Sequence, residues 1–327
     1  MDAKEKLTEI TRGYQPAVVL LSACQSGLFE TFREGAKSAE DAASELGLDF
    51  RATEMVLLAL AAEGVMIQNT DHRFSIATEY APFLLEGEPD SQIHIFRHNW
   101  AIMQSWCRLV ETMRTGKPIP KPDEKQAPDM LRNFICGMAD IARHSSREVA
   151  EKVNLSNYRK MLDVGGGPAS ASIAFCQKYP QLHATNFDLP APTEIAREEV
   201  EKAGMTDRIS LQAGNFLEDD LGSGYDLVYL SNIIHSLDED ETELVIGKCA
   251  KALDKGGTLI VKDFFLDDDR TSPTFAAYFS INMLVNTEGG KSYTEKETRE
   301  IMSRAGFGQF KTLPVASASA LLIGDKS

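Results

Sequence analysis

The 327-residue sequence predicts an α/β protein, in which a mostly parallel, doubly wound sheet follows a smaller, mostly helical domain. Two observations lead to this prediction. From about residue 156 onward, short apolar segments alternate with helical patterns, as parallel strands joined by crossover helices require. The last two apolar segments, near residues 309–316 and 319–324, are separated by too few residues for a crossover helix. We therefore expect these two to pair as an antiparallel hairpin.

The N-terminal part has the pattern of a winged helix. Residues 14–33 show helical periodicity, and Ser38 is expected to cap the helix that follows. A further amphipathic helix is expected within residues 48–66, and residues 66–80 contain two short apparent strands around an Asn-Thr-Asp turn. This succession predicts a winged-helix-like domain in residues 1–92.

The charge of the chain argues against nucleic acid as a partner of this domain. The first hundred residues hold eight Lys or Arg against sixteen Asp or Glu, whereas a phosphate-binding surface needs clustered cations. The formal net charge of the chain is -15, which also disfavours an anionic membrane surface. The apolar helix in residues 10–35 has more apolar surface than a small acidic domain can bury by itself. We therefore expect the protein to form a homodimer through this helix.

Composition also bears on compartment and metal content. No apolar run approaches the length of a membrane span, and the five cysteines lack the spacing of a disulfide framework or a zinc site. The six histidines show no metal-ligand spacing either. We expect a cytoplasmic protein that binds no metal.

The middle of the chain is expected to be a helical linker, residues 93–155, that contributes to the substrate pocket. Helical patterns cover residues 91–115 and 130–155, with a proline-rich surface loop at 116–129 between them. The sheet domain then occupies residues 156–327.

The most informative segment is a glycine-rich turn after the first predicted strand of that domain. Asp163 ends the strand, and Gly165, Gly166 and Gly167 allow a tight turn and close approach of a ligand to the start of a helix. NAD, FAD and nucleotide sites share this device, and a turn without any ligand is the simplest alternative. Asp163, however, would reach a cationic group, and Asp188 ends the next strand, where ribose hydroxyls bind. Together these acids fit S-adenosyl-L-methionine, which carries an ammonium, a sulfonium and a ribose.

Several segments in this order resemble one family along nearly the whole chain. The segments are LDVGGG (162–167), NFDLP (186–190), AGNFLED (213–219), LSNIIHSLDEDE (230–241), GGTLIVKDFF (256–265) and GGKSYTEKETREIMSRAGF (289–307). They resemble the class I, S-adenosylmethionine-dependent small-molecule O-methyltransferases of the caffeic acid, acetylserotonin and bacterial antibiotic-tailoring types. The resemblance implies a Rossmann-like methyltransferase sheet with an antiparallel last strand, a winged-helix dimerisation domain and a small-molecule acceptor.

The resemblance also implies positions for the cofactor. Besides Asp163, Gly165, Gly167 and Asp188, it places Asn215 and Phe216 beside the adenine and Ser231 at the end of a later strand. The family usually has Asp where Asn215 stands, but an amide oxygen still accepts a hydrogen bond from the adenine amino group. Ser231 stands where plant members have lysine and bacterial members commonly have serine.

By the same resemblance, His235 is the general base and Asp263 is the acid that orients it. His235 follows an apolar strand, where ligands collect in open α/β sheets, although a histidine there could simply cap the next helix. Ser292 replaces a second glutamate that flanks the base in plant enzymes. Methyl transfer to carbon, nitrogen or sulfur therefore stays an alternative, as does a non-catalytic, S-adenosylmethionine-binding regulatory protein.

An apolar acceptor pocket with few polar anchors is expected. By position relative to the family, its lining is expected to come from Trp106, Phe134, Met138 and Met283, with His98, Asn99 and His144 as looser candidates.

Overall fold

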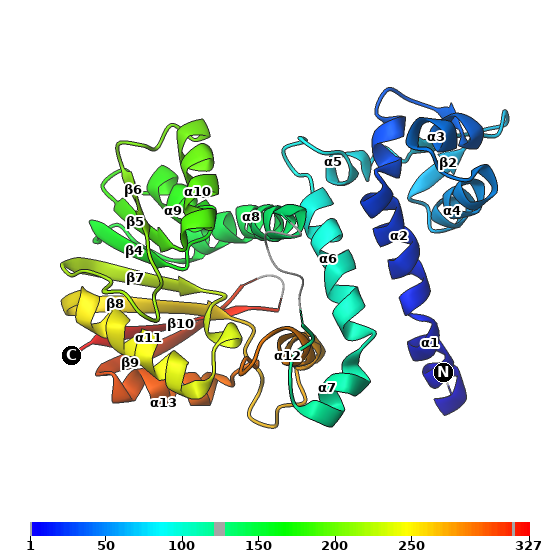
Figure 1. Cartoon of the computed structure of the whole chain (residues 1–327). Coiled ribbons are helices and arrows are strands. Elements are labelled where there is room, and N and C mark those ends of the chain that lie inside the picture. The colour runs from blue at the N-terminus through cyan, green and yellow to red at the C-terminus, as the bar shows by residue number, and fades with distance from the viewer. Residues whose placement is uncertain (1, 121–127, 316–317) are drawn as a thin grey trace. The chain divides into compact units, whose positions relative to one another are not determined.

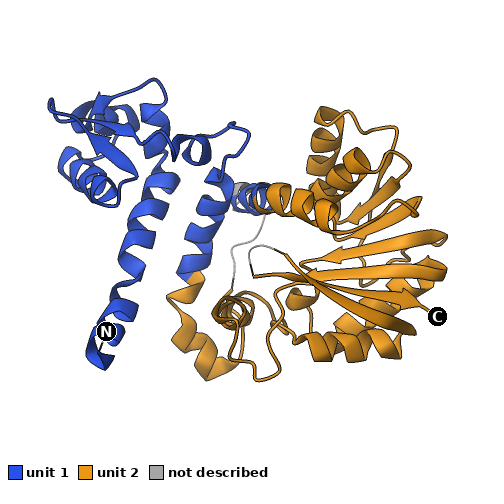
Figure 2. Ribbon diagram, turned by 180° about the vertical axis from the view of Figure 1, so that it is seen from behind, with its two compact units in different colours: residues 1–104, 127–140 blue, residues 105–126, 141–327 orange. Residues whose placement is uncertain are grey.

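The computed structural model describes residues 2–120, 128–315 and 318–327. The chain divides into two compact units, Met1–Gln104 with Ala127–Asp140, and Ser105–Gln126 with Ile141–Ser327 (Figure 2). Helix α8 (Pro128–Lys152) is one continuous helix that contributes residues to both units. The segment that the sequence predicts as a linker, residues 93–155, is thus shared between them.

Unit 1 begins with helices and a small sheet, as the N-terminal pattern predicts. Its elements up to residue 84 are α1 (Ala3–Arg12), α2 (Tyr14–Ser26), the 3-10 helix η1 (Leu28–Phe32), β1 (Lys37–Ser38), α3 (Ala39–Leu46), α4 (Phe50–Ala62), β2 (Met66–Gln68), β3 (Arg73–Ile76) and α5 (Ala81–Leu84). The expected hairpin is present as β2 and β3, and β1 adds a third strand in the order β1-β3-β2.

Local sequence explains where these helices begin and end. Ser38 caps α3 as expected, since its side chain accepts a hydrogen bond from the backbone N–H of Asp41 at 3.0 Å. The single helix expected over residues 14–33 is wrong, because Gly27 adopts a left-handed φ of 77° and ends α2. The core of the unit packs Leu28 and neighbouring apolar side chains of η1 against α4 and the small sheet.

Unit 2 contains a seven-stranded sheet in the order β6-β5-β4-β7-β8-β10-β9. Its strands are β4 (Lys160–Val164), β5 (His183–Asp188), β6 (Ile209–Ala213), β7 (Tyr225–Ser231), β8 (Leu253–Asp263), β9 (Phe307–Pro314) and β10 (Ala320–Lys326). The first five strands pair in parallel, whereas β10 runs antiparallel to both β8 and β9. The predicted antiparallel last strand is confirmed.

Helices cover both faces of this sheet (Figure 1). They are the C-terminal part of α8 together with α9 (Ser170–Lys178) and α10 (Pro190–Lys202) on one face, and α11 (Glu239–Ala252) and α13 (Glu295–Arg304) on the other. Helix α12 (Thr274–Asn286) lies beyond the ends of the strands, beside α7 (Leu109–Thr115). Alternate strand residues point to opposite faces, so Leu162 and Val164 pack with α11 and α13, while Met161 packs with α8, α9 and α10. The carboxyl ends of β4, β5 and β7 thereby lie at one edge, between two buried layers.

Two details of the middle of the chain differ from expectation or lie outside the described residues. The helix expected over residues 91–115 is interrupted near Cys107, which separates α6 (Ile93–Trp106) from α7 (Leu109–Thr115). Most of the proline-rich loop at 116–129 lies outside the described residues. In the described ranges, no helix is both long and apolar enough to cross a membrane.

Candidate active site

The glycine-rich turn connects β4 to α9 and disfavours a side chain at each of its three positions, for different reasons. Gly165 and Gly167 have φ of 66° and 52°, a left-handed conformation that favours glycine. A Cβ on Gly165 would lie 2.3 Å from Cδ1 of Ile233, and a Cβ on Gly166 would lie 1.9 Å from Oδ1 of Asn186. Packing therefore excludes a side chain at the first two positions, and backbone conformation disfavours one at the third.

Asp163 lies buried behind this turn. It is 1% exposed and accepts a hydrogen bond from Oγ of Ser172 at 2.7 Å. Burial raises the pKa of Asp163 to about 7, against the lowering effect of the Ser172 hydrogen bonds. A nearby cation would favour the charged form of this carboxyl. The environment thus fits the predicted contact with a cationic ligand group, and that contact stays a prediction.

Asp188 ends β5, the neighbour of β4 in the sheet. Its Oδ2 accepts a hydrogen bond from the N–H of Gly167, and its Oδ1 accepts one from the N–H of Leu189, both at 2.7 Å. Burial raises the pKa of Asp188, and these two backbone donors oppose the shift. Each carboxylate oxygen has a further lone pair, so Asp188 keeps acceptor capacity for ribose hydroxyls. A half-buried acceptor beside a glycine turn fits S-adenosylmethionine.

Asn215 and Phe216 lie in the segment that follows β6, and Phe216 is close to the glycine-rich turn. The Cε1 atom of Phe216 would lie 3.6 Å from a Cβ on Gly165, so its ring borders the turn. Oδ1 of Asn215 accepts a hydrogen bond from the N–H of Leu217 at 3.0 Å and retains one lone pair. The structure brings Phe216 to the glycines, and the predicted adenine contacts of both residues stay predictions.

Near the end of β7, the predicted Ser231 is accompanied by two polar residues that the sequence analysis passed over, Asn232 and Lys262. Ser231, a predicted cofactor residue, hydrogen-bonds the buried Tyr229. Asn232 has a φ of 57°, donates its N–H to the carbonyl oxygen of Lys262 at 2.8 Å, and accepts a bond from Nζ of Lys262 at 3.4 Å. Burial lowers the pKa of Lys262, which is 3% exposed. The sequence did offer a sign of this buried lysine, because Lys262 is a charged residue within the apolar segment of residues 256–265.

His235 and Asp263 form a hydrogen-bonded pair. His235 lies in the 3-10 helix η2 (Ile234–Ser236) just after β7, and its Nδ1 is 2.7 Å from Oδ1 of Asp263 at the end of β8. The side chains are 12% and 3% exposed. Oδ1 of Asp263 also accepts the N–H of Phe264 at 2.8 Å, which fixes the carboxylate. The alternative that His235 caps the next helix is wrong, because Asp238 caps α11 with a capping box.

This pair favours one tautomer of the neutral ring. A neutral imidazole that donates its Nδ1 proton to a carboxylate presents the Nε2 lone pair as an acceptor. In the described part of the chain, Nε2 of His235 forms no hydrogen bond. The arrangement can therefore accept a proton at Nε2 while Asp263 stabilises the resulting positive charge.

Two phenylalanines that sequence analysis missed contact His235, and a third packs against both of them. The ring of Phe279 meets that of His235 edge-to-face, with centroids 4.8 Å apart, and Phe264 lies 6.1 Å away. Phe275 contacts both of these rings, at 5.9 Å and 5.0 Å, and is 49% exposed. Phe275 and Phe279 are four residues apart on α12, a spacing that was visible in the sequence, but their meeting with β8 is tertiary. The base candidate thus has an aromatic environment.

Of the predicted pocket residues, Trp106 and Met283 lie in unit 2. Nε1 of Trp106 donates a hydrogen bond to Oδ1 of Asn282 at 3.0 Å, and Met283 is buried on the same helix, α12. Asn286 donates its Nδ2 proton to the same Oδ1 at 3.1 Å. These neighbouring amides on α12 were not singled out from the sequence.

The other predicted pocket residues lie on α8 and α6, and all of them except His144 belong to unit 1. Phe134 is 43% exposed and its ring lies 5.2 Å from that of His98, whereas Met138 is half-buried. Asn99 is exposed. His144, on the part of α8 that belongs to unit 2, is exposed as well. The roles of all these residues in acceptor binding stay predictions.

Comparisons with known proteins identify the family. The O-methyltransferase domain model matches residues 120–308. The chain is 34% identical to a 3-hydroxy-5-methyl-1-naphthoate 3-O-methyltransferase of Streptomyces sahachiroi, over 96% of this chain and 92% of that protein. It is 29% identical to the acetylserotonin O-methyltransferase of Bos taurus, over 92% and 91% of the two chains. The solved structure of PigF with SAH has a TM-score of 0.89 at 26% identity, covering 99% of this chain and 100% of that one.

The chain therefore belongs to the S-adenosylmethionine-dependent O-methyltransferases. Among the residues that the structure describes, no group of three or more His, Cys, Asp or Glu side chains is arranged to hold a metal ion.

Proposed function

We propose that this enzyme methylates a hydroxyl group of a small aromatic or polycyclic compound, with His235 as the general base. The observation that carries the proposal is the 2.7 Å bond between Nδ1 of His235 and Oδ1 of Asp263, which presents Nε2 as a proton acceptor. The surrounding rings of Phe264, Phe275 and Phe279 suit a flat acceptor.

A phenol has a pKa of about 10 and is a weak nucleophile at neutral pH, so loss of its proton must accompany attack. Nε2 of His235 takes this proton, and Asp263 stabilises the imidazolium. A base of this kind contributes roughly 10²–10⁴-fold to the rate. Asp163, the three glycines, Asp188 and Phe216 would hold S-adenosylmethionine, which supplies the methyl group when bound. The remaining contribution is alignment of the acceptor oxygen with that group.

The nature of the acceptor is supported by the environment of the base and by one relative. The relative from Streptomyces sahachiroi is named for a hydroxynaphthoate, a bicyclic aromatic acceptor. A ring of that type would pack against the phenylalanines beside His235. An aromatic hydroxyl compound is therefore the class we propose for this chain.

Product analysis tests the proposal. The protein is incubated with methyl-labelled S-adenosylmethionine and a panel of hydroxylated aromatic compounds, each paired with its deoxy analogue, and products are fragmented by mass spectrometry. We expect label on oxygen and none transferred to the deoxy partners. Label on carbon, nitrogen or sulfur would overturn hydroxyl methylation. Cofactor binding with no product from any member of the panel would favour the regulatory alternative.

We also propose that residues 1–92 are a winged-helix-like dimerisation domain, residues 93–155 a linker to the acceptor pocket, and that the enzyme is a cytoplasmic homodimer. Support for the dimer comes from α1 and α2, where Leu7, Ile10 and Tyr14 are 64%, 57% and 63% exposed. Leu7 and Ile10 are three residues apart on one face of α1, and Tyr14 begins α2 four residues later, after Gly13, whose backbone is also right-handed helical. Such a face is costly in water and suits burial against a second copy.

A further inference from the structure

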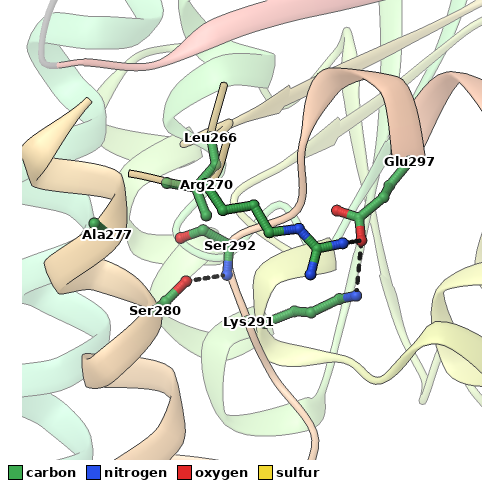
Figure 3. A pocket seen from close by; sticks show the side chains of 7 residues that line it. All are labelled: Leu266, Arg270, Ala277, Ser280, Lys291, Ser292 and Glu297. Carbon is green, nitrogen blue, oxygen red and sulfur yellow. Dashed lines mark hydrogen bonds and ion pairs between the residues drawn. The ribbon is translucent and has the colours of Figure 1, made fainter. Parts of the chain in front are cut away.

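Figure 3 shows a pocket of about 260 Å³ in unit 2 that the proposed reaction does not use. It lies between the loop after β8, helix α12 and the segment that leads into α13. Its charged lining consists of Arg270, Lys291 and Glu297. The volume lies below the roughly 300–1,000 Å³ of sites for drug-sized ligands, so the pocket suits a small molecule or one substituent of a larger one.

The pocket carries a surplus of positive charge. Nη2 of Arg270 lies 2.8 Å, and Nζ of Lys291 lies 3.1 Å, from the same oxygen of Glu297, its Oε1. The other oxygen of Glu297 accepts the N–H of Thr294 at 2.7 Å. Two cations thus share one carboxylate oxygen. The ammonium of Lys291 also lies 4.6 Å from the ring centroid of Tyr293, while the guanidinium of Arg270 keeps further hydrogens for donation. The lining therefore has two positive charges and one negative charge, whereas the chain as a whole has a net charge of -15.

The single negative charge in the pocket is permanent at neutral pH. Burial acts to raise the pKa of Glu297, but the hydrogen bond from Thr294 and the hydrogen bond and charge of Lys291 outweigh it, and the pKa falls below its usual value. The acids of the preceding loop do not line the pocket. Asp267 and Asp269 instead accept hydrogen bonds from Ser272 and Thr271 within their own turn.

The rest of the lining combines a hydroxyl with apolar surface. Oγ of Ser280 accepts the N–H of Ser292 at 2.9 Å, so its own proton remains available for donation. Leu266 and Ala277 supply apolar wall. An inorganic anion gains nothing from that wall, whereas the carbon body of an organic anion does.

We propose that this pocket binds a small organic carboxylate, which pairs with Arg270 and Lys291 and packs its body on Leu266 and Ala277. A guanidinium fork matches a carboxylate in a bidentate arrangement. Glu297 orients the two cations and competes with the ligand for them. The proposal concerns binding alone and holds whether or not His235 is the catalytic base.

The pocket also adjoins segments that contact His235. Gly290 precedes Lys291, and a Cβ on Gly290 would lie 2.4 Å from the carbonyl oxygen of His235. Ser280 follows Phe279, whose ring meets that of His235. Two residues that line the pocket, Lys291 and Ser280, are thus next in sequence to Gly290 and Phe279, which contact His235.

Calorimetric titration of the full chain, without S-adenosylmethionine or acceptor, tests the proposal. The probes are sodium benzoate and inorganic phosphate at low ionic strength, because Arg270 is 63% exposed and salt screens such a site. We expect wild type to bind benzoate more tightly than phosphate. Arg270→Ala is expected to weaken benzoate binding about tenfold, or ~1.4 kcal/mol. Glu297→Gln, which removes the competing charge, is expected to tighten it.

Arg304→Ala is the matched control, since Arg304 is another partly exposed arginine of unit 2 paired with a glutamate, Glu243. It should leave benzoate affinity unchanged. Equal benzoate affinities for wild type and Arg270→Ala would place the ligand elsewhere and overturn the proposal. Tighter binding of phosphate would overturn the carboxylate assignment. If the variants lose thermal stability while their affinity for benzoate is unchanged, the ion pairs of Arg270 and Lys291 with Glu297 have a purely structural role. The absence of any binding at millimolar benzoate would lead to the same conclusion.

Discussion

Ser292 donates its hydroxyl hydrogen to the backbone carbonyl oxygen of Ala276 at 2.9 Å, and it is 4% exposed. Its N–H is bonded to Oγ of Ser280, so both of its donors hold α12. This helix carries Phe279, which packs on His235. Ser292 thus anchors a helix, and its hydroxyl is committed to that contact. His235 is therefore left with Asp263 as its carboxylate partner.

Ser292→Ala should lower stability without impairing chemistry. The substitution leaves a buried carbonyl oxygen without this donor, at a cost of about 1 kcal/mol. Thermal denaturation should show a fall in Tm of a few degrees, and kcat should stay within about twofold of wild type, since Ser292 transfers no proton. A kcat reduced a hundredfold at unchanged Tm would instead place Ser292 in the reaction.

His235→Ala should lower kcat by roughly 10²–10⁴-fold, because it removes the proton acceptor. The affinity for S-adenosylmethionine, measured by calorimetry, should change little, since the glycine turn and Asp188 lie at other strand ends. Asp263→Asn should reduce kcat less, because the imidazole remains. His183→Ala, at an exposed histidine that starts β5, is the control and should be neutral. Wild-type turnover by His235→Ala would exclude general-base catalysis at this residue.

The stability of the cofactor-free enzyme should depend on pH through Asp163. Its folded-state pKa of about 7 lies above the ordinary 3.8, so the folded protein binds more protons between these values. The free energy of unfolding that Asp163 contributes is therefore fully present below pH 4 and is lost as pH rises through 7. Urea titrations of wild type and Asp163→Asn should diverge in favour of the variant by up to about 4 kcal/mol between pH 4 and 8. Parallel profiles would contradict the raised pKa.

Ile10→Asp should convert the enzyme from a dimer to a monomer of 36.0 kDa in light scattering at micromolar concentration. A charge in the centre of the face formed by Leu7, Ile10 and Tyr14 could not be buried against a second copy without a large desolvation cost. Leu244→Asp, at a 47% exposed leucine on α11, is the control and should leave the mass unchanged. A wild-type protein that is itself monomeric would refute the proposed interface.

The parts of the site that follow single strands were predictable from sequence. Glycines directly after an apolar segment, and Asp188 at the end of the next one, show their positions through strand periodicity alone. The pairing of His235 with Asp263 spans 28 residues, and it was expected because Asp263 matches the acidic residue that orients the histidine in the resembling family. Strand periodicity therefore locates residues that lie at the end of a strand, such as the glycines after β4 and Asp188 at the end of β5.

Features that depend on packing between distant segments were not predictable. The ring of Phe264 at the end of β8 meets Phe275 and Phe279 on α12 only through the path of the intervening loop. The commitment of Ser292 to Ala276 likewise depends on the placement of α12. The break between α6 and α7 near Cys107 lacks a glycine or proline, the residues that usually mark helix ends.

The insertion of β10 between β8 and β9 affects the order in which the enzyme is assembled during synthesis. Ala320 is the register partner of Asp263, and Leu321 and Leu322 fill the two core layers on either side of the sheet. A ribosome-bound chain that has not reached residue 320 already contains His235 and the glycine turn, yet β8 still has an open edge beside Asp263. The strand that carries Asp263 is therefore paired on both of its sides only once β10 is in place, so completion of this part of the sheet depends on a contact between segments distant in sequence.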